Sequence, residues 1–288
     1  MRKRILVPLT MLLFCYVAAG QQAQTPPQSL TFYYDYRVNP GKEEDFMTLV
    51  KTVGQPVRDK LMAEGVVQAW GVEVPILRYP GGTTHLIWFS VENWTGVEKV
   101  LSAMDAQLAK LAQDEAKTAA ETTRGRQKPA MTTAERIRDV FDMSKTRDWL
   151  IRDLVFGFST AANPAGLLPT TRYNFVKVKP GKGAEYRRTW EKYNKPVFDK
   201  LLSDGTVLAY GLSVEDVKTD GEFTHFIWIA TPNLAAADKV VAAFNADRGR
   251  RSEEERTAIS DLFTSLIEPD KSRSLLTRSI IFRVPGQK

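Results

Sequence analysis

The chain contains two histidines, His85 and His225, and they occupy the same place in two similar stretches of sequence. Each follows a threonine and precedes an apolar run through Ile and Trp that is typical of a strand. Histidine is the side chain most often used for proton transfer near neutral pH, and it is a common metal ligand. We therefore expect a catalytic role for this pair, as bases in related pockets. The alternative is a structural histidine that is hydrogen-bonded at the end of a strand.

Matched aromatic and basic residues are candidates for binding a ligand. Aromatic rings with a polar tip line clefts that hold flat apolar molecules. An arginine within an apolar stripe needs a carboxylate partner, either in the protein or on a ligand. The same residues are also explained as core aromatics and as internal ion pairs. The predicted ligand-binding residues are Tyr33, Tyr173, Trp70, Tyr210, Arg152 and Arg278.

Neither a metal site nor a bound cofactor is expected. Neither stretch supplies two histidines, and the carboxylates that could complete a shared site are not repeated, because Asp35 becomes Phe175 and Glu73 becomes Ser213. No glycine-rich phosphate loop, nucleophile elbow or His-Glu-x-x-His motif occurs in the sequence. The single cysteine, Cys15, lies in a segment that we expect to be removed, so thiol chemistry is not expected either.

The elements that must position these residues come from a duplication. Residues 31–93 match residues 171–233 at a constant offset of 140, with 22 identities in 63 positions. Further along, residues 144–156 match residues 270–282 at an offset of 126. Because chance similarity does not hold one register for so long, the pattern indicates a tandem repeat.

Each repeat predicts the same order of elements. In the first repeat we expect strands at 31–38, 66–74 and 84–90, helices at 43–64 and near 94–108, and a fourth strand that ends near 156. Pro56 and Pro196 lack a backbone donor and predict a kink or restart of the first helix in each copy. The order is β-α-β-β-α-β, the ferredoxin-like unit. One sheet face of such a unit needs cover, and a second copy can provide it.

The first twenty residues have the pattern of an export signal. Arg2, Lys3 and Arg4 form a basic start, an apolar run follows, and small residues at 18–20 fit cleavage after Gly20. The apolar run is too short for an ordinary membrane span. We therefore expect an exported protein, periplasmic or extracellular. The predicted divisions are a signal peptide at 1–20, a flexible leader at 21–29, the first repeat at 30–160 with an exposed insertion near 109–134, a linker at 161–169 and the second repeat at 170–288.

The charge balance argues against a nucleic-acid partner. The formal net charge is +6, but three of the 40 basic residues belong to the expected signal, which leaves 37 basic against 34 acidic residues. So small an excess does not indicate nucleic-acid binding. The expected partner is a small molecule. No stable membrane span is expected after signal removal, and a homodimer of the whole chain remains an alternative to a monomer.

Specific sequence features resemble the dimeric α+β barrel superfamily. They are the order of elements, the Pro-Gly-Lys turns at 40–42 and 180–182, and the passage from the third strand through Asn93 and Trp94 into a helix. That superfamily includes antibiotic-biosynthesis-type monooxygenases, EthD-like and NIPSNAP-like proteins and relatives of chlorite dismutase. The resemblance covers nearly all of residues 30–285. It implies an α+β fold in which two tandem ferredoxin-like repeats pack sheet to sheet as an intramolecular eight-stranded barrel.

The resemblance leaves several functions open, because one scaffold hosts many activities. In the chlorite dismutase relatives it would place an axial histidine on a helix, whereas both histidines here lie on predicted strands, so haem is not expected. The first hypothesis is a binding protein for a small, largely apolar organic molecule. The second is a cofactor-free monooxygenase or isomerase that acts on an aromatic substrate. The third is a structural or interaction module without a pocket.

Overall fold

The duplicated sequence produces the same elements twice. The computed structural model describes residues 29–78, 82–124, 130–159, 166–218 and 222–284. The strands of the first repeat are β1 (Leu30–Tyr36), β2 (Val67–Pro75), β3 (His85–Val91) and β4 (Arg147–Phe158). Those of the second are β5 (Thr170–Val176), β6 (Ala209–Val217), β7 (His225–Thr231) and β8 (Arg273–Arg283).

The helices also follow the repeat. The first repeat has α1 (Glu43–Leu49), a π-helical turn (Val50–Gly54), α2 (Gln55–Ala63), α3 (Trp94–Arg124) and α4 (Thr133–Val140). The second has α5 (Gly183–Tyr193), α6 (Lys195–Ser203), α7 (Ala235–Gly249) and α8 (Glu253–Leu266), and a short 3-10 helix (Pro269–Lys271) precedes β8.

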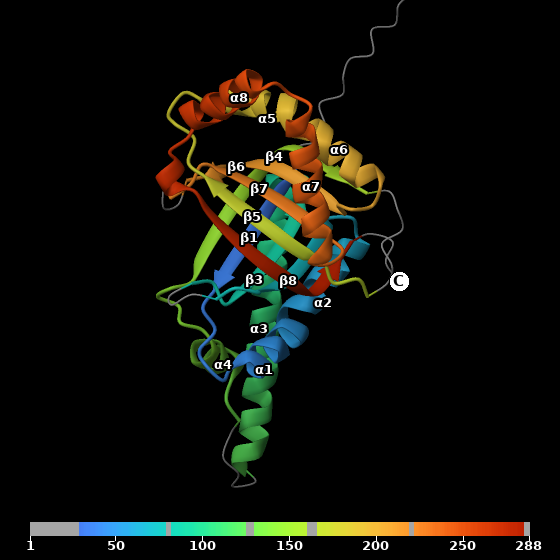
Figure 1. The fold of residues 1–288 in the computed structure, drawn as a ribbon. Helices are drawn as coiled ribbons and strands as arrows, with labels where there is room; N and C mark the ends of the chain where they lie inside the picture. Colours follow the sequence, from blue (N-terminus) through green and yellow to red (C-terminus); the bar gives the residue numbers. More distant parts are fainter. Residues whose placement is uncertain (1–28, 79–81, 125–129, 160–165, 219–221, 285–288) are drawn as a thin grey trace, which may run out of the picture.

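The eight strands form one closed barrel in the order β1-β3-β2-β8-β5-β7-β6-β4. Figure 1 shows the barrel between the helices of the first repeat and those of the second. Each repeat contributes a four-stranded antiparallel sheet with the ferredoxin-like order, fourth strand, first, third, second. The predicted α+β fold of two ferredoxin-like repeats in an intramolecular barrel is confirmed.

The two sheets join along two seams, β2 with β8 and β4 with β6. These seams lie four places apart in the ring of eight, so they are on opposite walls. Each seam contains a register shift, between Val72 and Glu73 on one side and between Asp153 and Val155 on the other. Closure removes the free sheet edges, and a β-bulge re-aims the side chains beside it.

Three apolar clusters hold the fold together. One lies between the first sheet and its helices, a second between the second sheet and its helices, and a third fills part of the barrel interior. The inner cluster is aromatic, with Trp149, Phe175 and Phe226 among its buried members. Strand alternation explains the division, because successive side chains point to opposite sheet faces.

Both prolines stand where the first long helix of each repeat is interrupted. Pro56 lies in the first turn of α2, directly after the π-helical turn that separates α2 from α1. Pro196 lies in the first turn of α6, and Asn194 separates that helix from α5. The predicted restart is therefore present in both copies, because a proline at a helix start needs no intrahelical partner for its nitrogen.

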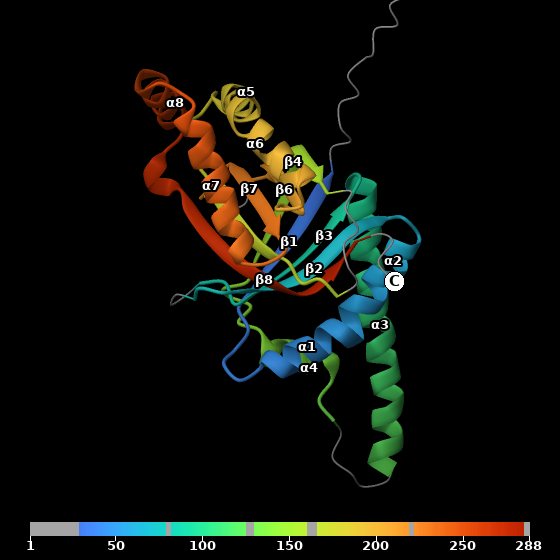
Figure 2. The same ribbon diagram turned by 45° about the vertical axis from the view of Figure 1, so that its right-hand side comes forward.

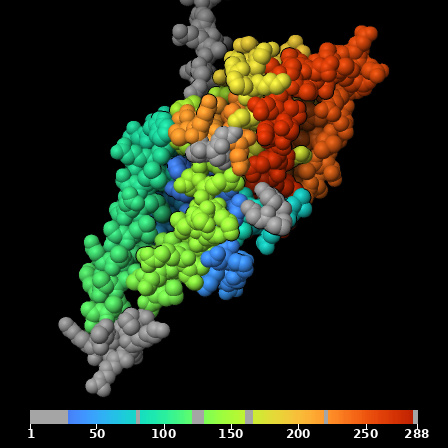
Figure 3. Space-filling view, turned by 90° about the vertical axis from the view of Figure 1, so that its left-hand side faces the viewer, coloured from blue at the N-terminus to red at the C-terminus, as the bar shows by residue number. Residues whose placement is uncertain are grey.

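Helix α3 extends well beyond the barrel (Figure 2). It continues to Arg124, past the predicted end near 108, so it carries much of the segment 109–134. Figure 3 shows α3 beside the segment that contains α4. This long helix has no counterpart of equal length in the second repeat, where α7 has 15 residues against 31 in α3.

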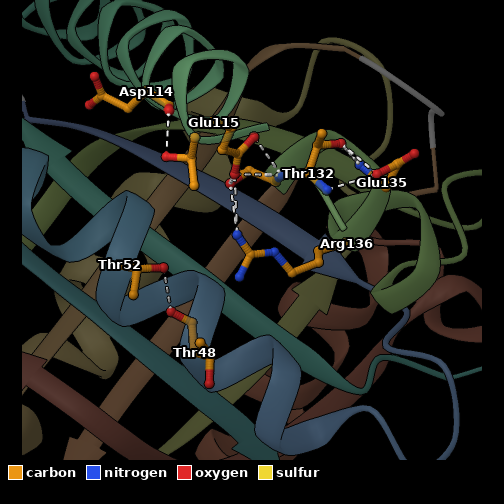
Figure 4. A network of polar contacts seen from close by, with 9 residues as sticks. Thr48, Thr52, Asp114, Glu115, Thr132, Glu135 and Arg136 are labelled. Atoms are coloured by element: carbon orange, nitrogen blue, oxygen red, sulfur yellow. Dashed lines mark hydrogen bonds and ion pairs between the residues drawn. The ribbon is translucent and has the colours of Figure 1, made fainter. Parts of the chain in front are cut away.

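A carboxylate fastens the projecting helix to α4 (Figure 4). Glu115 accepts hydrogen bonds from the backbone nitrogen of Thr133 at 2.8 Å, from its hydroxyl at 2.6 Å and from Arg136 at 3.2 Å. A capping box between Thr132 and Glu135 starts α4. These contacts position the helix without involving the barrel interior.

The expected signal peptide and most of the leader, residues 1–28, lie outside the described residues, as do residues 160–165 of the linker region. Among the residues that the structure describes, no helix is long and apolar enough to cross a membrane.

Candidate functional site

One end of the barrel interior contains a cavity of about 410 Å³. Its walls come from both repeats in matched pairs. The pairs are Thr31 with Thr171, Tyr33 with Tyr173, Ala69 with Ala209, Trp88 with Trp228, and Phe156 with Phe282. The cavity is largely apolar and aromatic, which is the usual lining of a small-molecule site. It has the size of such sites as well.

Alternation along β3 and β7 places the tryptophans in this cavity. Leu86 and Trp88 belong to the inner cluster, whereas Ile87 packs outside against the helices. Gly71 and Gly211 leave room for the indoles. A Cβ on Gly71 would stand 2.9 Å from the Trp88 ring, and one on Gly211 would stand 2.4 Å from the Trp228 ring. Each indole therefore packs closely against the neighbouring strand at a position that has no side chain.

A buried carboxylate, Glu73, lies beside the first indole. Its Oε1 accepts hydrogen bonds from Trp88 at 3.0 Å and Thr171 at 3.4 Å. Its Oε2 accepts from Tyr173 at 2.8 Å and Thr277 at 2.5 Å. A carboxylate has about four acceptor positions, and these four donors occupy them. The donors come from both repeats, so Glu73 also bridges one seam.

A second buried carboxylate, Asp153, lies beside the other indole. Its Oδ1 accepts from Ser213 at 2.5 Å and from Trp228 at 3.4 Å. Its Oδ2 accepts from Ser29 at 2.5 Å. Within the described residues Asp153 thus accepts three hydrogen bonds, one fewer than Glu73, and Oδ2 keeps an acceptor position for a further donor.

The two acids occupy related places although the repeat does not align them. Glu73 aligns with Ser213 at the offset of 140, and Asp153 aligns with Ser279 at the offset of 126. Across the seams, however, Glu73 faces Ser279 and Asp153 faces Ser213. Each seam therefore carries one acid and one serine, but on exchanged strands. An indole N–H donates to an acid at both seams.

Burial dominates the electrostatics of the cavity. It raises the pKa of Glu73 and of Asp153 above their ordinary values, and the surrounding hydrogen bonds oppose this only in part. Burial also raises the pKa of Tyr33 and Tyr173, and the charge of Glu73 adds to the effect. Acids with raised pKa values exchange protons closer to neutral pH, which is what acid-base catalysis requires.

The inner aromatic cluster forms the floor of the cavity. Tyr33 and Tyr173 meet edge to face with ring centroids 6.0 Å apart, and both contact Phe226. Beyond them Trp149 and Phe223 pack edge to face at 5.9 Å. The floor of the cavity therefore consists of packed aromatic side chains of the inner cluster.

Solved structures provide the comparison, since no family model and no curated protein of similar sequence matches the chain. A predicted monooxygenase from Fusobacterium nucleatum superposes with a TM-score of 0.56 at 11% identity, over 91% of this chain and 96% of that one. Another from Lactobacillus acidophilus gives 0.54 at 8% identity, over 91% and 98%. The fold is a dimeric α+β barrel. At such low identities the likeness shows the fold alone.

This dimeric α+β barrel holds both halves in one chain, and its histidines lie outside the cavity. His85 packs on Phe46 with ring centroids 4.2 Å apart, and His225 contacts Tyr186 at 5.3 Å. Both side chains are buried between a sheet and its helices, and each ring lies near the hydroxyl of the preceding threonine. Burial lowers the pKa of both histidines to about 4. The structure therefore does not bring the predicted catalytic pair together.

The predicted ligand-binding aromatics divide into two groups. Tyr33 and Tyr173 line the barrel cavity. Trp70 and Tyr210 are buried on the outer side of their sheets, where Trp70 donates to Asp59 of α2 at 3.0 Å and Tyr210 donates to Asp199 of α6. Their polar tips thus hold helices against the barrel.

The predicted arginines lie away from the cavity lining. Arg152 forms a two-pronged ion pair with Asp216, at 2.7 Å and 3.2 Å, which is the internal pairing that the sequence left as an alternative to a ligand. Arg278 is exposed on β8. Neither side chain contributes to the site built by Glu73 and Asp153.

Sequence reasoning missed the two acids as site residues. Alignment of the repeats treats Glu73 as lost in the second copy, since the equivalent position is Ser213. The available signal was that Asp153 shares a strand face with the apolar residues Ile151 and Val155, two positions away on either side. Within the described residues, no group of three or more His, Cys, Asp or Glu side chains is arranged to hold a metal ion.

Proposed function

We propose that the barrel cavity binds one small, flat, largely apolar organic molecule, and that the protein oxidises it as a cofactor-free oxygenase. The observation that carries this proposal is the presence of two buried carboxyl groups in an aromatic cavity, Glu73 and Asp153. Glu73 has a structural use, because its four donors come from both repeats, whereas Asp153 keeps an acceptor position within the described residues. Burying a carboxyl group is costly, and a role of Asp153 in catalysis accounts for that cost.

Asp153 is the proposed proton acceptor. Among the residues that the structure describes, three donors contact Asp153 and leave one acceptor position on Oδ2, whereas the four positions of Glu73 are occupied. The raised pKa of Asp153 makes the carboxylate a stronger base than an exposed one. Glu73 instead holds Trp88 and Tyr173 in place as cavity walls.

The proposed reaction balances with dioxygen as the only co-reactant. A CH₂ group activated by neighbouring aromatic rings loses a proton to Asp153, and the carbanion transfers an electron to O₂. Combination of the two radicals and return of the proton give a hydroperoxide. Loss of water from it leaves a carbonyl group, so that CH₂ and O₂ become C=O and H₂O. An electron-rich substrate thus supplies all the electrons itself.

The comparisons support this proposal at the level of fold. Two proteins with TM-scores above 0.5 carry the name monooxygenase. At such low identity no residue role transfers from them, so the proposed roles are those of this chain's own acids, Glu73 and Asp153. Binding without turnover is the second candidate function, favoured by the apolar lining of the cavity.

Oxygen uptake with anthrone tests the proposal. Anthrone is flat, and its CH₂ lies between two rings, so it is a suitable probe. We expect oxygen uptake above the rate without protein and conversion of anthrone to anthraquinone, in which the CH₂ has become C=O. The uptake rate should fall about a hundredfold or more in Asp153→Asn, the scale of a removed general base. Asp238→Asn, an exposed acid on α7, is the matched control and should match the wild type. Uptake that Asp153→Asn leaves unchanged would contradict the assignment, and binding without uptake would favour the binding protein.

We further propose that the chain is exported and cleaved after Gly20. The basic start and apolar run at the N-terminus support this. An intact mass of the protein from an exporting host tests it. A mass that begins at Gln21 is expected, and a mass that retains Met1 to Gly20 would contradict it.

A further inference from the structure

The ring of strands has an internal twofold axis that runs along the barrel. Each strand corresponds to the strand four places along the ring, β1 to β5, β3 to β7, β2 to β6 and β8 to β4. A half-turn about the barrel axis therefore exchanges the repeats. The matched pairs that line the cavity show that the cavity lies on this axis. The two repeats thus share this barrel cavity.

The two carboxyl groups face this cavity from opposite walls. Trp88 and Trp228 belong to strands four places apart, and each donates its indole N–H to the acid on its own side. The exchange of acid and serine across the seams keeps one carboxyl group on each wall. A half-turn therefore brings the Glu73 side of the cavity onto the Asp153 side, although the acids come from non-equivalent strands.

We propose that the ligand lies across the internal twofold axis and carries hydrogen-bonding groups, hydroxyl or oxo, on two opposite edges. This inference deepens the proposed function and rests on its binding step. A ligand with one polar edge would leave the polar cluster on one wall facing an apolar surface. Asp153 Oδ2 on one wall and the hydroxyl oxygen of Thr171 on the other, which donates to Glu73, can each accept a hydrogen bond from the ligand, so a second polar edge should add affinity.

The size and shape of the cavity support a single occupant. An eight-stranded barrel has room inside for its side chains or for one small ligand. The Tyr33 and Tyr173 rings meet edge to face and both line the cavity. Trp88 and Trp228 line the cavity from opposite walls, and aromatic side chains are a suitable lining for one flat aromatic ligand.

Two pairs of flat probes test the inference. The first pair is 2,6-dihydroxynaphthalene with 2-naphthol, and the longer pair is 4,4'-dihydroxystilbene with 4-hydroxystilbene. Binding to the full chain is measured by calorimetry, which gives both affinity and stoichiometry. We expect one molecule per chain. At least one diol should bind about tenfold more tightly than its mono-hydroxy counterpart, the effect of one additional buried hydrogen bond.

Variants then locate the two polar edges. Thr171→Val, which removes the cavity hydroxyl beside Glu73, and Asp153→Asn should each reduce the affinity of the diol to about that of the mono-hydroxy probe. The mono-hydroxy probe can use the remaining wall, so each variant should change its affinity only about twofold, the statistical factor for losing one of two orientations. Asp238→Asn should change neither affinity. The wild-type comparison stands alone if a variant does not fold.

The outcomes separate this inference from the proposed function. Equal affinity of both diols and their counterparts, at one molecule per chain, would overturn the inference and leave the binding function in place. Two molecules per chain would also overturn it. If none of the four probes binds, the proposed binding function fails together with the inference.

Discussion

Trp88 donates its indole N–H to Glu73 across 3.0 Å, and this bond links the aromatic wall of the cavity to a buried acid. The bond forms because Gly71 lets the indole lie against the neighbouring strand. Trp228 and Gly211 repeat the arrangement on the opposite wall. The relationship shows how the duplication preserves a local geometry even where the acid itself moves to another strand.

The close contact at Gly211 predicts a loss of stability on adding one methyl group. Gly211→Ala would place a carbon 2.4 Å from the Trp228 ring, so the indole must move and lose its bonds to Ser213 and Asp153. Overpacking of this kind costs about 1–3 kcal/mol. Urea denaturation measures it. Gly249→Ala, which meets no atom within 4 Å, is the control, and equal stability of both variants would contradict the account.

The buried acids predict a pH-dependent cost to stability. Burial raises the folded pKa of Glu73 and Asp153, so above the ordinary values of 4.5 and 3.8 the unfolded chain releases these protons first. The free energy of unfolding then falls as pH rises, by up to about 1.4 kcal/mol per pH unit for each acid, until the folded pKa is reached. Below the ordinary values this cost is absent.

Urea denaturation of Glu73→Gln and Asp153→Asn between pH 4 and pH 8 measures this term. Each variant loses hydrogen bonds and should be less stable than the wild type at pH 4. The deficit should shrink as pH rises, because the variants lack the titrating group. A deficit that stays constant over this range would show that the acids titrate normally.

The histidines predict a slope of the opposite sign. Their pKa values fall from 6.5 to about 4 on folding, so between these pH values the unfolded chain binds protons that the folded chain does not. The free energy of unfolding therefore decreases as pH falls from about 6.5 towards 4. At about 1.4 kcal/mol per unit, each accounts for roughly 3 kcal/mol. Replacement of both by glutamine should flatten stability over that range. The affinity of this double variant for the naphthalene diol should equal that of the wild type. A large loss of affinity would show that the histidines contribute to the ligand site.

Much of the fold was predictable because duplication supplies long-range information that a single copy lacks. The constant register of residues 31–93 and 171–233 identified the repeat, and the proline positions located the helix restarts. The sequence could not show which strands meet at the seams. Only the pairing of β2 with β8 and β4 with β6 sets Glu73 opposite Ser279 and Asp153 opposite Ser213.

Residue type alone was a weaker guide to the site. His85 and Trp70 carry polar atoms on aromatic rings, and the structure uses both on the outer side of the sheet, against the helices. On β3, alternation puts His85 and Ile87 on one face and Leu86 and Trp88 on the other, but alternation does not say which face lines the barrel. In a barrel with helices outside, both faces are buried, so composition does not distinguish them.

The central claim is that the barrel cavity holds the ligand, and filling the cavity tests it most directly. Native mass spectrometry with 2,6-dihydroxynaphthalene should show one bound molecule on the wild type and none on Ala209→Phe, whose ring would occupy the cavity. Ala237→Phe, in a surface groove beside α7, should bind like the wild type. Thermal unfolding establishes that both variants are folded. Undiminished binding to folded Ala209→Phe would contradict the account.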